Sequence, residues 1–409
     1  MTKRILLLTQ WFDPEPTFKG MVFARELVNR GYEVEVITGF PNYPGGKLYP
    51  GYRIKLLQRE NIDNVEVTRV PLYPNHDGSA FKRILNYLSF ALSAIIYGVF
   101  IAKKADVMYV YQPPLTTGVA AAVIRLFRRI PVIYDIQDMW PDTLRATGMV
   151  NNESVLNIVG NICGWVYQNV DKITVLSPGF KQLLIDRGVP SEKVEVIYNW
   201  CDEASLNAPV GGVPDSFPSS DKFTILFAGT MGKAQALDGV IAAAEIVKKQ
   251  QPQVNFVFVG GGIELDHLKQ LAINRKLDNV TFIPKVPMSQ VGAMLQQADV
   301  LLVHLKNDSL FTVTIPSKIQ AYFAVGKPVL MGLLGDAASL VAEAKCGVIA
   351  TPENPQSIAD AAISLATLSP AELHAMGQRG KDFYDREMSL EVGVSNFSIL
   401  FDQAIELKL

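Results

Sequence analysis

Cysteine and histidine are scarce in this sequence, and neither residue type is clustered. The three cysteines, an odd number, stand far apart at Cys163, Cys201 and Cys346. The four histidines show none of the spacings of a metal site. Dispersed, odd-numbered cysteines are typical of reduced thiols in a cytoplasmic protein. The sequence therefore predicts neither a disulfide framework nor a metal centre.

An excess of charge of one sign is also lacking. Lys and Arg number 38 against 40 Asp and Glu, which gives a net charge of −2 and no indication of nucleic-acid binding. Hydrophobic residues make up 49% and charged residues 19%, as in a globular protein with a rather apolar composition. A chain of 409 residues is too long for one ordinary core, so we expect two domains.

The common phosphate-binding motifs are missing as well. No segment matches the P-loop pattern Gly-x-x-x-x-Gly-Lys-Ser/Thr, and the first expected strand, Arg4–Thr9, is not followed by Gly-x-Gly-x-x-Gly. These absences argue against ATP hydrolysis and against an NAD-dependent enzyme.

The chain has one long uncharged run, Leu85–Ala102, flanked by Lys82 and Arg83 and by Lys103 and Lys104. Its length reaches the threshold for a membrane span, but polar residues interrupt it and a buried strand follows at once, which favours a crossover helix of the core. The basic flanks are compatible with a peripheral contact to anionic lipid. The N-terminal residues lead directly into a strand, so we expect no signal peptide.

What the sequence does contain is a regular alternation of strand and helix patterns. In the first half, helical patterns such as Val22–Arg30, Leu115–Phe127 and Val155–Gln168 separate strands at Arg4–Thr9, Glu33–Thr38, Val65–Val70, Val107–Tyr111, Val132–Asp135, Lys172–Leu176 and Val194–Ile197. A second series has strands at Phe223–Phe227, Asn255–Val259, Val280–Ile283, Val300–Val303, Pro328–Met331 and Gly347–Ile349. Such alternation predicts parallel, doubly wound sheets covered by helices.

The predicted fold class is therefore α/β, with two doubly wound, Rossmann-like domains. Residues 202–221, rich in Pro, Gly and Ser, form the expected linker between a domain at 1–201 and a domain at 222–388. An amphipathic helix at 389–409 is expected to pack back across a domain. Two such domains form a cleft where the carboxyl ends of their sheets face each other, and ligands bind at such crevices.

The stretch around Lys318 is the strongest candidate site in the second half. The strand Val300–Val303 leads into a loop, and Pro316, Ser317 and Lys318 open a helical pattern that contains Tyr322. Lysine opposes the dipole at a helix start, so its presence there favours a bound anion. The alternative is an ordinary strand–helix junction.

Small residues follow three other strands of the second half. The loops contain Gly229, Thr230, Lys233 and Gln235, then Gly260 and Gly261, then Lys285 and Val286. Glycines allow a backbone to approach phosphate or base closely, although each of them alone has an ordinary steric explanation. Together with residues 316–318, these loops predict a nucleotide diphosphate in the second domain.

The first half offers different chemistry. The loop after the first strand contains Lys19 and Gly20, and an aromatic, Pro- and Gly-rich segment contains Asn42 and Tyr43. These aromatic residues suit a sugar or an aromatic ligand, and a stiff structural loop is the alternative.

Asp135, Asp138 and Asp142 surround Trp140 at the end of the fifth strand. Asp138 or Asp135 is the candidate acid or base, whereas Asp142 suits a helix cap and the group lacks a third metal ligand.

Assembled, these residues resemble the retaining glycosyltransferases of family 4 with the GT-B fold, in the bacterial O-antigen and capsule branch that includes N-acetyl-L-fucosamine transferases. The resemblance covers nearly the whole chain. It rests on Trp11–Gly20, Gly39–Gly46, Asp138–Asp142, Gly229–Gly232 with Gln235, Pro316–Lys318 and Gly326–Val329.

The resemblance implies a UDP-sugar donor in the second domain and an undecaprenyl-diphosphate-linked glycan acceptor at the first. It implies no metal cofactor, because Lys318, helped by Lys233 or Lys19, would neutralise the leaving diphosphate. Asp138 and Asp135 would orient the sugar or acceptor, or stabilise charge at the anomeric carbon. The enzyme would be cytoplasmic and peripheral at the inner membrane.

Two features depart from the family pattern. Most members carry two glutamates spaced eight apart, and the aligned positions here are Val313 and Ala321. The usual lysine of the first nucleotide loop is Gln235. A nucleotide-sugar 2-epimerase, a two-lobed sugar-binding protein and an inactive partner subunit remain alternatives.

Overall fold

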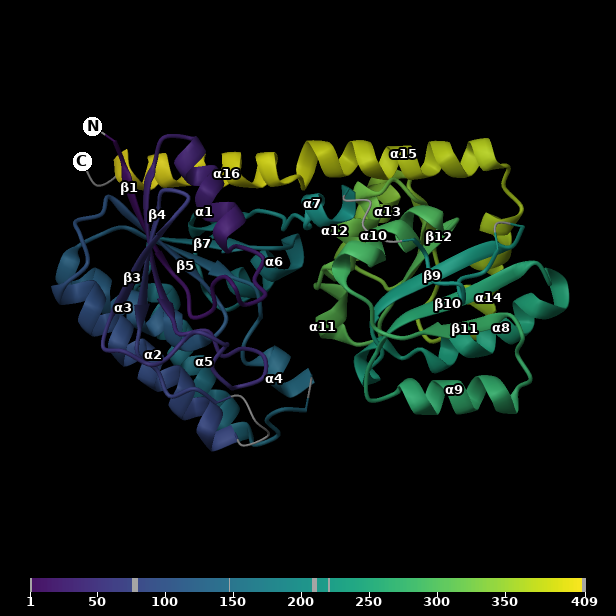
Figure 1. Cartoon of the computed structure of the whole chain (residues 1–409), viewed down its shortest axis with the longest axis horizontal. Coiled ribbons are helices and arrows are strands. Elements are labelled where there is room, and N and C mark those ends of the chain that lie inside the picture. The colour runs from purple at the N-terminus through teal and green to yellow at the C-terminus, as the bar shows by residue number, and fades with distance from the viewer. Residues whose placement is uncertain (1, 76–79, 147, 208–211, 220, 407–409) are drawn as a thin grey trace. The chain divides into compact units, whose positions relative to one another are not determined.

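The computed structural model describes residues 2–75, 80–146, 148–207, 212–219 and 221–406. The chain forms two compact units (Figure 1). The first consists of Met1–Ile197 together with Gly393–Leu409, and the second of Tyr198–Val392. Each unit is a sheet of parallel strands, with one antiparallel edge strand in the first unit, and helices pack on both sheets, so the predicted α/β fold class with two doubly wound domains is confirmed.

The sheet of the first unit has the order β3-β4-β2-β1-β5-β6-β7-β8. Its strands are β1 (Arg4–Leu8), β2 (Glu33–Gly39), β3 (Gln58–Ile62), β4 (Val65–Val70), β5 (Val107–Tyr111), β6 (Val132–Ile136), β7 (Lys172–Val175) and β8 (Val194–Val196). Sequence patterns predicted every one of these except β3, which pairs antiparallel with β4 at the sheet edge. The sequence of β3, Gln-Arg-Glu-Asn-Ile, is polar because an edge strand does not enter the core.

Helices cover this sheet and form most of its core contacts. They are α1 (Met21–Asn29), α2 (Ala80–Phe100), α3 (Leu115–Arg128), α4 (Asp142–Ala146), α5 (Glu153–Gln168), α6 (Pro178–Asp186) and η1 (Ser191–Lys193). The last helix, α16 (Leu390–Glu406), also packs here. The ring of Phe397 in α16 lies 5.3 Å from that of Tyr109 and 5.4 Å from that of Phe23. The chain's C-terminal helix therefore contributes to the core of the first unit.

The second unit has an all-parallel sheet of order β11-β10-β9-β12-β13-β14. Its strands are β9 (Phe223–Thr230), β10 (Val254–Gly261), β11 (Val280–Ile283), β12 (Val300–His304), β13 (Val329–Gly332) and β14 (Gly347–Ile349), all at the predicted places. Its helices are α7 (Glu203–Asn207), η2 (Lys233–Gln235), α8 (Asp238–Gln250), α9 (Leu265–Asn274), α10 (Met288–Gln297), α11 (Ser309–Thr312), α12 (Lys318–Ala324), α13 (Asp336–Ala344), α14 (Pro355–Ala366) and α15 (Pro370–Glu387).

The stretch predicted as a linker, 202–221, lies inside the second unit. It contains α7, whose Leu206 carbonyl oxygen accepts a hydrogen bond from Gln296 Nε2 of α10 at 3.4 Å. A Cβ on Gly292 of α10 would come within 2.9 Å of that same oxygen, so the two helices are in close contact. Glu203 also accepts a hydrogen bond from the hydroxyl of Tyr384 at 2.7 Å. These contacts move the boundary between the units to Ile197 and Tyr198.

Candidate active site

Two of the predicted elements of the second unit meet at Lys318. The ammonium of Lys318 lies 3.6 Å from the ring centroid of Phe227, within the range of a cation–π contact. Gly229, two residues further along β9, has φ +142°, and a Cβ there would come within 3.3 Å of Lys318 Nζ. A side chain at position 229 would therefore crowd the ammonium, whereas glycine does not.

Burial lowers the pKa of Lys318 to about 7. No ion pair to Lys318 occurs within the part of the chain that the structure describes. A desolvated cation without a carboxylate partner is unfavourable, and a bound anion would relieve it. This is the electrostatic property expected of a diphosphate site.

The glycines of the neighbouring loops divide into two kinds. Gly260 pairs with Gly229 in the β9–β10 ladder, and a Cβ on Gly260 would lie 2.1 Å from the carbonyl oxygen of Gly229. A Cβ on Gly262 would lie 2.1 Å from the carbonyl oxygen of Met231. A Cβ on Gly261, by contrast, would meet nothing within 4 Å. Gly260 and Gly262 thus allow the two loops to pack, and Gly261 leaves open space.

Three polar side chains near these loops bind to the protein itself. Gln235 Oε1 accepts a hydrogen bond from the backbone N–H of Gly232 at 3.0 Å. The hydroxyl of Tyr322 accepts a hydrogen bond from the backbone N–H of Ala228 at 3.1 Å. His304 lies between two loops, with Nδ1 2.7 Å from the carbonyl oxygen of Gln235 and Nε2 accepting from the N–H of Glu353. Burial lowers the pKa of His304, which fits this neutral ring. Gln235 and Tyr322, both predicted to bind the donor, hold the loops in place.

The remaining donor residues are accessible to different degrees. Thr230, Lys233 and Lys285 are exposed, and Val286 is half-buried. Helix α12 begins at Lys318, with Pro316 and Ser317 just before it, and the side chain of Ser317 makes no capping hydrogen bond. With only seven residues, α12 has a small dipole, so the charge at this place comes mainly from the Lys318 side chain.

In the first unit, Asp135 and Lys19 form a buried ion pair. Lys19 Nζ donates to Asp135 Oδ2 at 2.6 Å, and both side chains are fully buried. Asp135 also accepts from the hydroxyls of Tyr109, at 2.5 Å, and Thr174, at 2.8 Å. Burial of two charges is tolerated when they are paired and hydrogen-bonded. Both residues, predicted to act on the substrate or the diphosphate, are here bound to each other, and the pair ties the loop after β1 to β6.

Asp138 has the opposite surroundings. Gln112 fixes its backbone, because Gln112 Oε1 accepts from the N–H groups of Gln137 and Asp138, both at 2.9 Å. Among the described residues, nothing donates a hydrogen bond to the Asp138 carboxylate, and burial raises its pKa. A rigidly held carboxyl group with a raised pKa is suited to acid–base or electrostatic work. Asp142 instead pairs with Arg187 at the start of α4.

The loops after β1 and β2 are joined by Glu15, a residue that sequence analysis did not single out. Its Oε1 accepts hydrogen bonds from the N–H groups of Asn42 and Tyr43, both at 2.7 Å, and its Oε2 accepts from Phe12 at 3.3 Å. Burial raises the pKa of Glu15 to about 7, against the lowering effect of these hydrogen bonds. An acidic residue within the Pro- and aromatic-rich segment 11–20 was the only sequence signal for this role.

Glu15 places an aromatic pair at these loops. The rings of Trp11 and Tyr43 stack with centroids 4.3 Å apart. Asp138 lies close enough to contribute, after burial, to the raised pKa of Tyr43. The structure thus brings Tyr43, one of the residues predicted for the sugar or acceptor loops, close to the candidate acid Asp138 within the first unit.

The other residues predicted for these loops make contacts within the protein. Asn42 is buried and donates to the carbonyl oxygen of Phe40 at 2.9 Å. A Cβ on Gly20 would lie 2.2 Å from Asp13 Oδ2, which accepts from the N–H of Met21 at the start of α1. Trp140 is half-buried, and its carbonyl oxygen accepts from Arg187 at 3.1 Å.

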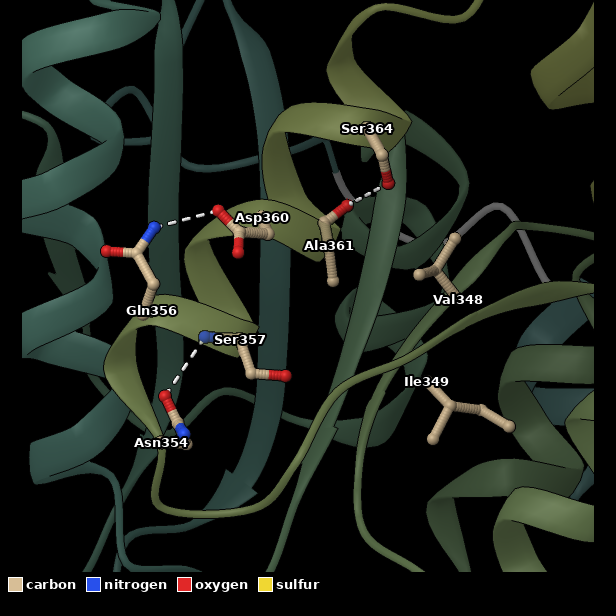
Figure 2. A pocket seen from close by; sticks show the side chains of 8 residues that line it. All are labelled: Val348, Ile349, Asn354, Gln356, Ser357, Asp360, Ala361 and Ser364. Atoms are coloured by element: carbon tan, nitrogen blue, oxygen red, sulfur yellow. Dashed lines mark hydrogen bonds between the residues drawn. The ribbon is translucent and has the colours of Figure 1, made fainter.

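Outside these places, the second unit has a shallow hollow between α14 and β14 (Figure 2). Its one charged side chain, Asp360, accepts a hydrogen bond from Gln356 at 2.8 Å. None of the predicted site residues lines it; the lining residues are Val348, Ile349, Asn354, Gln356, Ser357, Asp360, Ala361 and Ser364. The described residues contain no group of three or more His, Cys, Asp or Glu that could hold a metal ion.

Both halves of the chain match known families. Residues 21–200 match the family described as glycosyl transferase 4-like domain, and residues 214–383 match glycosyl transferases group 1. The chain is 28% identical over 336 residues to WcaI of Escherichia coli (strain K12), which is named as a glycosyl transferase of colanic acid biosynthesis. That similarity covers 79% of this chain and 81% of WcaI. It is 21% identical over 267 residues to the glycosyltransferase WbjE of Pseudomonas aeruginosa, covering 63% and 65% of the two chains.

Solved structures share the architecture at lower identity. Sucrose-phosphate synthase from Thermosynechococcus elongatus has a TM-score of 0.72 and 16% identity, over 99% of this chain and 100% of that one. The Anabaena protein Alr3699/HepE in complex with UDP-glucose has a TM-score of 0.68 and 14% identity, over 98% and 99% of the two chains. At these identities the similarity shows the fold alone.

Proposed function

Since the chain belongs to the family 4 glycosyltransferases with the GT-B fold and is a nucleotide-sugar-dependent enzyme, we propose that its donor is a UDP-sugar and its acceptor a glycan on a lipid diphosphate. The proposed sugar is an N-acetylated deoxy-sugar such as N-acetyl-L-fucosamine. The proposed pathway is bacterial surface polysaccharide synthesis, either O-antigen of lipopolysaccharide or capsule. The name of WcaI, which assigns it to colanic acid, supports this class of product.

The observation that carries the proposal is the position of Lys318. Its ammonium lies beside Gly229, where any side chain would crowd it, and burial lowers its pKa to about 7. A nucleoside diphosphate supplies the negative charge that this cation lacks. UDP and UDP-glucose in complexes of the HepE fold relative support uridine as the base.

The proposed reaction needs no metal ion. Lys318, with exposed Lys233 as a second cation of the same unit, would stabilise the negative charge that develops on the leaving diphosphate. The bond between the anomeric carbon and the diphosphate oxygen breaks, and the acceptor oxygen bonds to the same face of that carbon. Because attack and departure take place on the same face, the anomeric configuration is retained, and the acceptor proton passes to the leaving phosphate.

Asp138 is the carboxylate proposed to act on the sugar. Its backbone is fixed by Gln112, and no described residue donates a hydrogen bond to its carboxylate. A carboxylate in such a position stabilises positive charge at the anomeric carbon or orients the acceptor. The stacked rings of Trp11 and Tyr43 offer an apolar platform for a sugar.

A lipid-linked acceptor places the enzyme at the cytoplasmic face of the inner membrane, as a peripheral protein. One described helix, Phe81–Phe100, is long and apolar enough to cross a membrane by length and composition. Its buried side, which includes Phe90 and Ala94, packs within the first unit, so a position along the membrane surface suits it better.

The test is an assay of purified enzyme with a panel of UDP-sugars, an undecaprenyl-diphosphate-linked acceptor and EDTA. The proposal predicts UDP release that depends on the acceptor, and a product with the anomeric configuration of the donor. Conversion of a UDP-sugar without acceptor would identify an epimerase instead. Sugar binding without any turnover would identify a binding protein.

A further inference from the structure

Helix α2 exposes an apolar face that nothing in the described chain covers. The side chains of Phe81, Leu92 and Phe100 are 68%, 61% and 78% exposed. The exposed large residues recur every three or four positions and so lie along one side of the helix; they are Phe81, Leu85, Leu88, Leu92, Ile96 and Phe100. Soluble monomers rarely expose a contiguous apolar stripe of this length, and such stripes mark interaction sites.

The end of α3 extends this face. Arg128 donates hydrogen bonds to the carbonyl oxygens of Gly98, at 2.8 Å, and Ala102, at 3.0 Å, so the C-terminal ends of α2 and α3 are tied together. Leu126 and Phe127, in the last turn of α3, are 56% and 70% exposed. Phe100 and Phe127 therefore belong to one apolar end of the helix pair.

Helix α5 presents a second stripe next to α3. Its large exposed residues are again three or four apart; they are Val155, Ile158, Ile162 and Trp165. Helix α3 packs against both α2 and α5, so the three helices form one layer over the sheet of the first unit. A partly exposed tryptophan is typical of the interface between lipid and water.

Two exposed basic side chains lie at the α2–α3 end. Lys104 and Arg129 are exposed, and neither forms an ion pair with another described residue. Helix α2 contains no acidic residue. Two copies of this chain joined through α2 would bring these like charges together, which disfavours self-association. Anionic lipid headgroups complement them.

The buried side of α2 argues for lying on a membrane rather than crossing it. The hydroxyl of Tyr97 donates to Glu35 of β2 at 2.8 Å, and Phe90 and Ala94 are fully buried. Pulling this side into lipid would break core contacts. The exposed side alone can enter the interfacial region of a bilayer.

We propose that the exposed faces of α2 and α5 and the C-terminal end of α3 form a lipid-binding surface, which holds the first unit on an anionic bilayer. The role of this surface, which is to bring the enzyme to its lipid-linked acceptor, rests on the proposed function.

The experiment is cosedimentation of the full chain with vesicles of phosphatidylcholine alone or with phosphatidylglycerol added. We expect binding to the mixed vesicles that weakens with salt, and little binding to phosphatidylcholine. The double variant Phe100→Glu, Phe127→Glu should lose at least tenfold in vesicle affinity. The variant Ile273→Glu, at an exposed apolar position of α9 in the second unit, should bind like the wild type.

Failure of the wild type to bind either vesicle, or equal loss in the Ile273→Glu control, would overturn the proposal. So would a dimer in sedimentation velocity that the double variant dissociates. UDP-induced thermal stabilisation of each variant reports folding and the donor site. Wild-type enzyme that transfers sugar to a detergent-solubilised acceptor but binds no vesicles would contradict the lipid-binding surface alone. Vesicle binding by the wild type without any transfer would contradict the proposed function alone.

Discussion

At the scale of single residues, Lys318 is the group whose surroundings are least favourable without a ligand. Burial lowers its pKa to about 7, and the cation has the Phe227 ring but no carboxylate beside it. The free protein therefore holds this lysine partly neutral near pH 7. A diphosphate stabilises the protonated form, so binding and protonation are linked.

This linkage predicts proton uptake when UDP binds. Above pH 7, Lys318 of the unliganded protein is largely neutral. UDP affinity should therefore fall by up to about tenfold for each pH unit between pH 7 and the higher pKa that Lys318 has in the UDP complex. At pH 8 binding should take up close to one proton. Calorimetry in two buffers with different ionisation enthalpies measures this number, and uptake near zero at pH 8 would mean that another group neutralises the diphosphate.

Asp135 and Asp138 should respond differently to replacement by asparagine. Asp135→Asn leaves buried Lys19 without its ion-pair partner, so we expect a loss of about 3–5 kcal/mol in the free energy of unfolding. Asp138→Asn removes a carboxylate with no described hydrogen-bond donor, so stability should change little while kcat falls by at least tenfold. Denaturant unfolding and steady-state kinetics distinguish the two; equal destabilisation by both substitutions would make Asp138 a structural residue.

Glu15 should make stability depend on pH between about 4.5 and 7. Its pKa is raised from 4.5 to about 7 in the folded protein, so the folded state favours the protonated carboxyl. The stability that Glu15 contributes is fully present below pH 4.5 and is lost as the pH rises through 7. Glu15→Gln, compared with the exposed control Glu153→Gln, should therefore gain stability relative to wild type between pH 5 and pH 8. A constant difference across this range would contradict the assignment.

At the scale of elements, the glycine loops offer a matched pair of substitutions. Gly260→Ala places a methyl group 2.1 Å from the carbonyl oxygen of Gly229, at a backbone φ of +136°. We expect a loss of about 1–3 kcal/mol in unfolding free energy, from overpacking and backbone strain. Gly261→Ala meets no atom within 4 Å and should leave stability nearly unchanged. Thermal unfolding of the two variants checks this, and similar losses would show that the loops are arranged differently.

The sequence patterns predicted the strands well because both sheets are parallel and buried. Strands such as β5, with every residue buried, have apolar runs that periodicity detects. Strand β3 was missed because a polar edge strand has no such run, and α7 was assigned to a linker because the neighbouring residues are rich in Pro and Gly. Helix α12 begins two residues after Pro316, which was expected in its first turn.

The candidate site was only partly predictable for a similar reason. The spacing of strand ends indicated that Gly229 and the Lys318 segment share one sheet edge, and the structure brings the two together. Whether a polar residue faces a ligand or the protein depends on contacts between distant segments. Glu15 binds residues of the loop after β2, and Asp135 binds Lys19, partners that no local pattern reveals. Tyr322, predicted for the donor site, likewise accepts a hydrogen bond from the distant Ala228.

At the scale of the whole molecule, the chain consists of two doubly wound units, each of which matches a glycosyltransferase family. The first unit carries Asp138, the Trp11–Tyr43 pair and the apolar helix layer. The second carries the Lys318 site. This division suits the proposed function, in which the first unit would bind the lipid-linked acceptor and the second the nucleotide sugar.

The most direct test of the central claim is UDP binding without metal, measured by thermal stabilisation of the wild type, Lys318→Met and Lys327→Met. Lys327 is the matched control, because it is a half-buried lysine of the same unit whose pKa burial also lowers. We predict that UDP raises the unfolding temperature of the wild type and of Lys327→Met, and that Lys318→Met remains folded but shows no shift. An unchanged shift in Lys318→Met would contradict the assignment of Lys318 as the diphosphate-binding cation.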